Sequence, residues 1–226
     1  MHIPLTRIQK LIGQRMLESK LSKPCFSIES KADVTEMMAL RPRLGKSLGV
    51  RVTSNSFLIR ALAVATARHP LMMGRVHAAN SRMTVRIPEA VNVGFPVHAP
   101  QGLVVPVIKN ADKKALAQIA QLEKQLTEKA RSNKLTLEEM QGQTIGLSNL
   151  GVYGIDSFCG IVSPVASAIL AVGNVIKTAW PDDGQISVRR LMSLALTADR
   201  RVVHETYAAG FLNDIIKQLQ DPQGLV

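Results

Sequence analysis

The first part of the chain alternates between two spacings of apolar residues. Residues 7–21 predict an amphipathic helix, whose apolar face would be formed by Ile8, Leu11, Ile12 and Met16. Residues 25–34 alternate between apolar and polar positions and predict a strand. A second helix is expected after this strand, capped by Asp33 or Thr35, and we expect Pro42 to interrupt it because proline removes a helical hydrogen bond.

The middle of the chain combines one further helix with strand-like segments. Residues 55–68 have helical spacing. Residues 91–98 alternate, and a second apolar run covers 103–108. The turn residues Pro100-Gln101-Gly102 between the two runs predict a hairpin, and Pro106 indicates an edge or bulged position in it.

The second half of the chain contains two helices that flank three apolar runs. The helices are predicted over 113–132 and 206–219, and the apolar runs cover 144–149, 167–176 and 187–198. Strands mixed with covering helices indicate a single α/β domain over residues 1–226. The predicted fold is a two-layer sandwich of a mixed, mostly antiparallel sheet with helices on it.

Composition excludes several classes of protein. The chain has 226 residues, of which 46% are hydrophobic and 20% charged, as in an ordinary globular domain. The longest apolar stretches are too short to span a bilayer, and the N-terminus does not resemble a signal peptide. Cys25 and Cys159 have no metal or redox spacing, so we expect buried free thiols in a reducing compartment and no metal site.

The formal net charge of +11 raises the question of an acidic partner. Nucleic acid is one candidate. However, the basic residues are dispersed and aromatic residues make up only 4% of the chain, whereas single-strand binders need aromatic stacking platforms. We therefore expect no nucleic-acid partner and no membrane partner. A basic surface also suits phosphorylated small molecules or acidic proteins.

Several segments, in order along the chain, resemble the catalytic domain of the dihydrolipoamide acyltransferases of 2-oxoacid dehydrogenase complexes. The resemblance extends through nearly all of the sequence. The segments that carry it are Leu5-Thr6-Arg7-Ile8, Asn92-Val93-Gly94, Gly102 to Ile108, Asn110 to Lys114, Ser148-Asn149-Leu150-Gly151 and Ala168 to Gly173.

This resemblance implies a fold, an assembly and a pair of substrates. The family domain folds like chloramphenicol acetyltransferase and forms homotrimers whose active sites lie between subunits, and the trimers assemble into hollow cores. Coenzyme A and a dihydrolipoyl group enter each site from opposite sides, so both are implied as substrates here. Lipoyl domains and other complex subunits are implied as partners, in the cytoplasm or the mitochondrial matrix. We expect neither a lipoyl attachment site, nor a lipoyl domain, nor a peripheral-subunit-binding domain within residues 1–226.

The active-site motif departs from the family pattern. The family motif is Asp-His-Arg-x-x-Asp-Gly, in which the histidine is the general base. This chain has Asp199-Arg200-Arg201-Val202-Val203-His204-Glu205 at the matching positions. Arg200 thus matches the histidine position and His204 the second aspartate position. A guanidinium stays charged and cannot act as a base. Ser148 matches the family serine that donates a hydrogen bond to the oxyanion.

Three functions follow as hypotheses. The first is a catalytically impaired subunit that forms the core. The second is an active acyltransferase that uses His204 as a relocated base or accepts an unusual acyl group. The third is a regulatory module that binds coenzyme A without turnover. For His204 we expect a capping or packing role.

Overall fold

A six-stranded mixed sheet forms the centre of the computed structural model, which describes residues 2–79, 82–100, 102–182 and 184–226, without the side chain of Ile8. Its strands in spatial order are β1 (Cys25–Asp33), β10 (Gln185–Asp199), β9 (Ala168–Asp182), β8 (Ile145–Asn149), β4 (Val93–Gly94) and β7 (Val107–Ile108). The strand β8 runs parallel to β9 and β4, and the other neighbours are antiparallel. This agrees with the predicted mixed, mostly antiparallel sheet.

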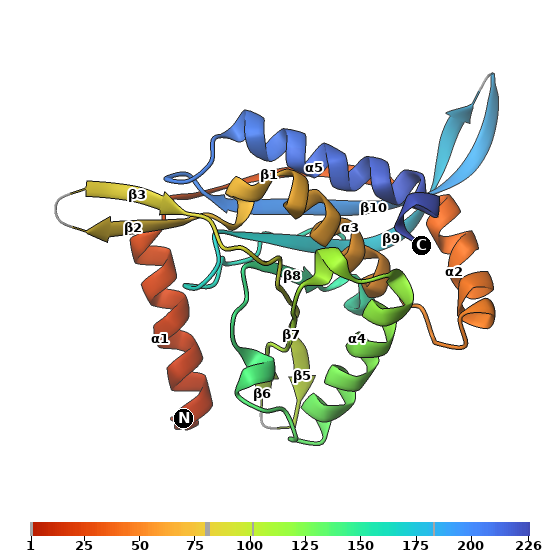
Figure 1. Ribbon diagram of the computed structural model, residues 1–226. Coiled ribbons are helices and arrows are strands. Elements are labelled where there is room, and N and C mark those ends of the chain that lie inside the picture. The colour runs from red at the N-terminus through yellow and green to blue at the C-terminus, as the bar shows by residue number, and fades with distance from the viewer. Residues whose placement is uncertain (1, 80–81, 101, 183) are drawn as a thin grey trace.

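Helices α3 (Ser54–Arg68) and α5 (Glu205–Gln220) lie across one side of this sheet (Figure 1). Their apolar stripes are buried against the strands because helical spacing places those side chains on one face. The fully buried residues include Phe57, Leu62 and Phe211 from the helices and Leu170 and Leu196 from the sheet. The predicted helices 55–68 and 206–219 are therefore confirmed, and they form the second layer.

Helix α4 (Leu116–Arg131) confirms most of the helix predicted over 113–132. It begins three residues later than predicted, because Ala111–Lys113 form a separate 3-10 turn. Four positions of its predicted apolar stripe are buried, namely Leu116, Ile119, Ala120 and Leu126. Glu123 is also buried on this helix.

Helix α2 (Thr35–Ser47) contradicts the predicted interruption at Pro42. The helix continues through this proline for another turn, and Leu40 and Leu44 on either side of it pack against the core. Their burial compensates for the hydrogen bond that the proline ring cannot make. At the N-terminus of α2, Asp33 Oδ1 accepts a hydrogen bond from the backbone N–H of Thr35 at 2.9 Å, although Val34 is the capping residue.

The predicted hairpin around residues 100–102 exists but is split into two short ladders. Strands β5 (Val97–Ala99) and β6 (Gly102–Val104) pair separately from β4 and β7, which belong to the main sheet. The split occurs beside Pro96 and Pro106, each of which lacks a backbone N–H for a continuous ladder. Pro106 lies between β6 and β7, outside both strands and next to the edge strand of the sheet, which is consistent with the expected edge or bulged position. Gln101 lies outside the described residues.

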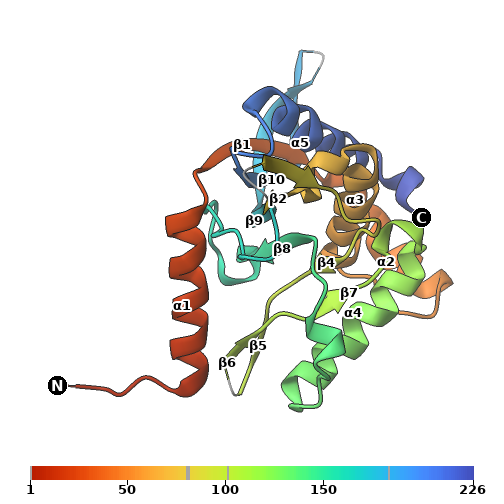
Figure 2. The ribbon, with the colours of Figure 1, turned by 60° about the vertical axis from the view of Figure 1, so that its left-hand side comes forward.

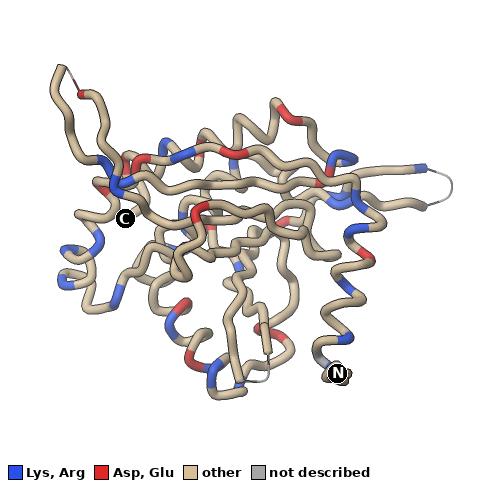
Figure 3. Tube along the Cα trace, turned by 180° about the vertical axis from the view of Figure 1, so that it is seen from behind, with Lys and Arg blue, Asp and Glu red and all other residues tan. Residues whose placement is uncertain are grey.

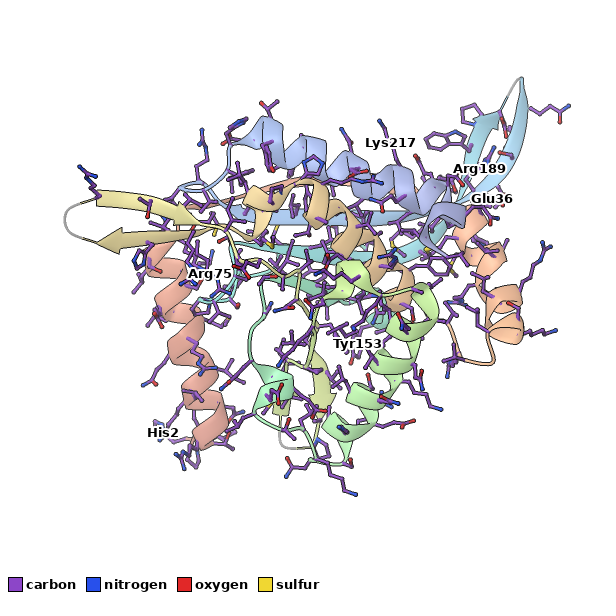
Figure 4. The ribbon with its side chains drawn as sticks, viewed as in Figure 1. His2, Glu36, Arg75, Tyr153, Arg189 and Lys217 are labelled. Carbon is purple, nitrogen blue, oxygen red and sulfur yellow. The ribbon has the colours of Figure 1, made fainter. Side chains whose placement is uncertain are left out.

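Two hairpins extend beyond the sheet (Figure 1). One pairs β2 (Arg75–Ala79) with β3 (Arg82–Arg86), and β2 was not predicted from the sequence. The other is the distal part of β9 and β10, and its root lies against α2. Figure 4 shows Arg189 of β10 and Glu36 of α2 close to each other there, where Arg189 Nη2 also lies 2.5 Å from Asp182 Oδ2.

Helix α1 (Arg7–Ser22) stands apart from the layered body (Figure 2). Its C-terminal end is attached to residues 162–166. Ser19 Oγ donates to the Val162 carbonyl, and Lys23 Nζ donates to three carbonyls of Ser163, Pro164 and Ala166. Of the predicted apolar face, Ile12 and Met16 are half-buried and Leu11 is exposed. The helix is confirmed, but within one chain most of its apolar surface has no cover.

Basic residues are dispersed over the molecule. Figure 3 shows them along α1 and α2 and at the root of the β9–β10 hairpin, with acidic residues between them. Among the described residues no helix is both long and apolar enough to cross a membrane. Cys25 and Cys159 are free thiols, but both are exposed, so the expectation that they would be buried is wrong. Cys25 is the first residue of β1, and Cys159 lies in an irregular loop, so neither thiol reaches the core.

Candidate functional site

Ser148 lies near the C-terminal end of β8, where this strand leaves the buried part of the sheet. Ile145 and Leu147 are buried, whereas Ser148 is partly exposed. The strand is followed by a tight turn in which a Cβ atom on Gly151 would lie 2.3 Å from the Gly173 carbonyl oxygen. No side chain fits there, so glycine is required at this position. The close approach of these two backbones fixes the turn that follows Ser148.

The side chain of Asn149 is held in one orientation beside this turn. Its Nδ2 donates to Asn55 Oδ1 at 2.7 Å, and its Oδ1 accepts the backbone N–H of Gly151 at 2.9 Å. Asn55 lies in the first turn of α3, which packs on the sheet. The turn after Ser148 is therefore connected to a core helix through two side-chain amides.

A second polar cluster lies at the end of β10. Asp199 is 1% exposed and accepts hydrogen bonds from the Arg201 guanidinium, including Nε to Oδ1 at 3.0 Å and Nη2 to Oδ2 at 2.7 Å. This bidentate pair raises the pKa of Arg201. The Asp199 carbonyl also accepts the backbone N–H groups of Val202 and Val203. These bonds fix the segment in which Arg200 and His204 lie.

Arg200 points away from this buried pair. Its Nε donates to Glu205 Oε1 at 2.8 Å, and about half of each side chain is exposed. The pKa of Glu205 is lowered, first by a hydrogen bond from its own backbone N–H and then by Arg200. At position 200 the structure therefore holds a guanidinium, which stays protonated and cannot accept a proton, paired with the Glu205 carboxylate.

His204 is the N-terminal cap of α5. Its backbone is extended, with φ −98° and ψ 168°, and its Nδ1 accepts the backbone N–H of Tyr207 at 3.3 Å. A nitrogen that accepts this bond must be unprotonated. The geometry within one chain is the capping geometry that we expected. That His204 points away from a substrate channel and from Ser148 of a neighbouring subunit stays a prediction.

Ser148 and Arg200 are far apart within a single chain. Ser148 is level with Ala171 of β9, which is level with Ala195 of β10. The end of β10 at Asp199 is about 13 Å further along the strand and about 10 Å across the sheet, from standard strand dimensions. The separation therefore exceeds about 15 Å, and one chain does not bring the two positions together.

Cys25 and Lys23 lie beside the second cluster. Cys25 is level with Asp199 in the β1–β10 ladder, and the Arg200 N–H donates to the Pro24 carbonyl. Partial burial raises the pKa of the Cys25 thiol, although the residue as a whole is exposed, and Asp199 raises it further. Burial lowers the pKa of Lys23, whose ammonium contacts three carbonyls. A thiol with a raised pKa is a poor nucleophile.

Sequence reasoning missed Asn55 and Glu123. Glu123 is 8% exposed, and its carboxylate accepts hydrogen bonds from Thr53 Oγ1 at 2.8 Å and Ser56 Oγ at 2.6 Å. One signal was present, because Glu123 falls between Ile119 and Leu126 on the apolar stripe of its helix. A charged residue at such a position is rarely buried without a partner. Among the described residues no cluster of three or more potential metal ligands occurs.

The whole chain is similar to proteins of known family. The model of the family described as 2-oxoacid dehydrogenases acyltransferase (catalytic domain) matches residues 1–226. The acetyltransferase component of the pyruvate dehydrogenase complex of Rickettsia felis is 34% identical over 224 residues, which cover 97% of this chain and 53% of that protein. The succinyltransferase component of the 2-oxoglutarate dehydrogenase complex of Haemophilus influenzae is 33% identical, covering 99% and 55%. The chain thus spans about half the length of these curated relatives.

Solved structures agree with the sequence relatives. The dihydrolipoamide acetyltransferase of Azotobacter vinelandii superposes with a TM-score of 0.93 at 31% identity, covering 100% of this chain and 93% of that one. The cubic core of a pyruvate dehydrogenase multienzyme complex gives the same TM-score and identity, with the same coverage. A chloramphenicol acetyltransferase, at 15% identity and a TM-score of 0.54, covers 92% of each chain and supports the predicted fold class.

Proposed function

Because the chain belongs to the family of 2-oxoacid dehydrogenase acyltransferase catalytic domains, we propose that it is a core-forming subunit of such a complex whose acyl transfer is impaired. The observation that carries the proposal is the Arg200–Glu205 ion pair at the position of the family's general base. The proposed substrates, where any transfer remains, are coenzyme A and a dihydrolipoyl group.

Moving an acyl group from one thiol to another has two chemical requirements. A base must remove the proton of the attacking thiol, and a donor must stabilise the oxyanion of the tetrahedral intermediate. Ser148 suits the second role because it lies partly exposed at the start of a rigid turn. Arg200 does not suit the first role, since its guanidinium stays protonated. A fixed cation could favour a thiolate electrostatically, but it cannot move the proton.

The spacing of the site residues supports their assignment. In the Azotobacter vinelandii enzyme, a serine, a histidine and an asparagine were investigated for their role in catalysis, and they are separated by 52 and 4 residues. Ser148, Arg200 and His204 have the same two separations along this chain. This supports the assignment of Arg200 to the histidine position.

A relocated base at His204 is the weaker alternative. The hydrogen bond from Tyr207 N–H to His204 Nδ1 holds the imidazole over its own helix. The side chain also starts four residues from position 200, and a misplacement of about 1 Å can cost about 100-fold in rate. We therefore assign His204 the role of a cap.

The proposed assembly is a homotrimer or a multiple of three. A single chain separates Ser148 from Arg200 by more than about 15 Å, so a complete site would need a neighbouring copy. Exposed apolar side chains provide surface for it, namely Leu11, Leu17 and Leu21 of α1 and Val152, Ile161 and Val165 after β8. Lipoyl domains and other subunits of the complex are the proposed partners. Because the relatives are bacterial or mitochondrial, we place the protein in the cytoplasm or the mitochondrial matrix.

Two measurements test this function. Light scattering at micromolar concentration should give a multiple of three times 24.6 kDa, and a mass of one chain would reject the assembly. Acetyl transfer from acetyl-coenzyme A to dihydrolipoamide should be weak or absent. A kcat of about 1–1000 s⁻¹, which is typical of enzymes, would reject the impairment.

A further inference from the structure

The two faces of β8 have different surroundings. Ile145 and Leu147 lie in the hydrophobic core, and Asn149 continues their face because side chains alternate along a strand. On this face Asn149 Nδ2 donates to Asn55 Oδ1 of α3 at 2.7 Å. Ser148 belongs to the opposite face of the same strand. The end of β8 is therefore attached to the helix layer by the side chain that follows Ser148.

The backbone sets the direction of the hydrogen bonds at this attachment. A backbone N–H can only donate, so the Gly151 N–H requires the Oδ1 atom of Asn149, which lies at 2.9 Å. The NH₂ group of Asn149 then faces the other way and requires an acceptor, which Asn55 Oδ1 supplies. The orientation of Asn149 is thus fixed from both sides. We call Asn55 and Asn149 the amide pair.

The turn after Ser148 does not need the second amide for its own closure. An asparagine that accepts the N–H two residues further on closes such a turn by itself. Asn55 adds a fixed point, because it lies in the first turn of α3, where Thr53 and Ser56 form a reciprocal capping box. The amide pair therefore connects the turn to a rigid part of the second layer.

We propose that Asn55 and Asn149 are positioning residues for Ser148. They hold the backbone of residues 148–151 against α3, so that the Ser148 hydroxyl keeps one place on the opposite face of β8. Both side chains act through the backbone and not by contact with substrate. The catalytic meaning of this arrangement rests on the proposed oxyanion role of Ser148, but the position of the turn can be measured without turnover.

The first test is amide hydrogen exchange at Gly151 in the assembled protein. Asn55→Leu keeps a side chain of similar size and removes the acceptor of Asn149 Nδ2. Exchange at Gly151 should become about threefold to tenfold faster, within the range that corresponds to one net hydrogen bond. The Leu150 N–H donates to the Val172 carbonyl, so its exchange should change by less than about twofold. If Asn55→Leu does not fold, Asn55→Ala replaces it with the same expected selectivity.

Ser54→Ala is the matched control for this variant. Ser54 lies in the same turn of α3, but its hydroxyl contacts Arg41 and Met38 and not the amide pair. Loss of this hydroxyl should leave exchange at Gly151 within about twofold of the unmodified protein. An acceleration as large as that of Asn55→Leu would show that any damage to this turn of α3 loosens the Ser148 turn.

Two variants at position 149 test the direction of the hydrogen bonds. Asn149→Leu removes both bonds and should accelerate exchange at Gly151 at least as much as Asn55→Leu. Asn149→Asp keeps an acceptor for the Gly151 N–H, and the Asn55 amide can rotate so that its NH₂ group donates to the new carboxylate. Asn149→Asp should therefore keep exchange at Gly151 within about twofold.

Turnover supplies a readout that a purely structural role would not change. In the background of Arg200→His with His204→Asp, Asn55→Leu should lower the kcat of acetyl transfer to dihydrolipoamide about threefold to tenfold. The KM for acetyl-coenzyme A should stay within about twofold, because an oxyanion donor acts only in the transition state.

The outcomes separate this proposal from the proposed function. Equal acceleration of Gly151 and Leu150, no acceleration by Asn55→Leu, or equal acceleration by Asn149→Asp and Asn149→Leu would each overturn the proposal. An unchanged kcat in an active background that needs Ser148 would also overturn it. A background without turnover would reject the proposed function, whereas exchange at Gly151 would still decide whether the amide pair holds the turn.

Discussion

The Nε of Arg200 donates a 2.8 Å hydrogen bond to the carboxylate of Glu205, and about half of each side chain is exposed to solvent. An exposed pair of this kind typically contributes about 0–1 kcal/mol, so the fold does not depend on it. By contrast, the adjacent Asp199–Arg201 pair has one fully buried partner. Arg200 and Arg201 therefore contribute differently to the free energy of unfolding, and this difference can be measured.

Arg201→Ala should destabilise the protein far more than Arg200→Ala. Removing Arg201 leaves the buried Asp199 carboxylate without its bidentate partner, which should cost about 3 kcal/mol in the free energy of unfolding. Removing Arg200 should cost no more than about 0.5 kcal/mol. Urea unfolding of both variants at one protein concentration measures the difference. Equal losses would show that Arg200 is part of the structural framework.

Many strands and helices of the fold could be predicted from the sequence, because they depend on the local periodicity of apolar residues. The strands at 25–34, 167–176 and 187–198 and the helices at 55–68 and 206–219 have apolar positions that match one face of the observed element. The errors arose where tertiary packing overrides a local rule. Pro42 does not end α2, since Leu40 and Leu44 hold the helix against the core.

The candidate site was only partly predictable for a similar reason. Ser148, Arg200 and His204 could be found through a motif, because their spacing along the chain is fixed. The contacts of Glu123 with Thr53 and Ser56, and of Asn149 with Asn55, join residues that meet only in the folded chain. Sequence periodicity does not predict such contacts. The one signal in the sequence was an acidic residue, Glu123, on the apolar stripe of its helix.

Glu123→Gln should change the pH dependence of stability. The pKa of Glu123 is raised in the folded protein, chiefly by burial. Its protonated form therefore favours the folded state, and this contribution is present below the pKa of the unfolded chain and is lost as pH rises through the folded value. The stability of the unmodified protein relative to Glu123→Gln should therefore fall as pH rises above the unfolded pKa of glutamate, about 4.3.

Glu139→Gln is a control in which the pH dependence of stability should have the opposite sign. The pKa of Glu139 is lowered, first by the hydrogen bond from Lys129. Its contribution is present above the unfolded pKa and is lost as pH falls through the folded value. Thermal unfolding from about pH 2 upwards should show the Glu139 contribution growing with pH below the unfolded pKa of about 4.3 and the Glu123 contribution shrinking with pH above it. Slopes of the same direction would contradict the assignment of Glu123.

Gly151→Ala should damage the Ser148 turn. The added Cβ would lie 2.3 Å from the Gly173 carbonyl oxygen, and both atoms belong to rigid backbone. We expect a loss of at least about 3 kcal/mol, or failure to fold. Gly45→Ala in α2 is the matched control, because its Cβ would meet ordinary contacts at 3.5 Å or more. It should stabilise the helix by about 0.5–1 kcal/mol. Similar unfolding midpoints for the two variants would refute the close backbone packing.

The most direct test of the central claim is the rate of acetyl transfer from acetyl-coenzyme A to dihydrolipoamide by the unmodified protein and by the double variant Arg200→His with His204→Asp. This variant places a histidine at position 200 and the aspartate of the motif at position 204, where, by the same spacing, the Azotobacter vinelandii enzyme has an asparagine. We predict that its kcat exceeds that of the unmodified protein by about 100-fold to 10,000-fold, the usual contribution of a general base. The gain should disappear when Ser148→Ala is added. An unmodified protein that already transfers acetyl groups at the rate of the double variant would contradict the account.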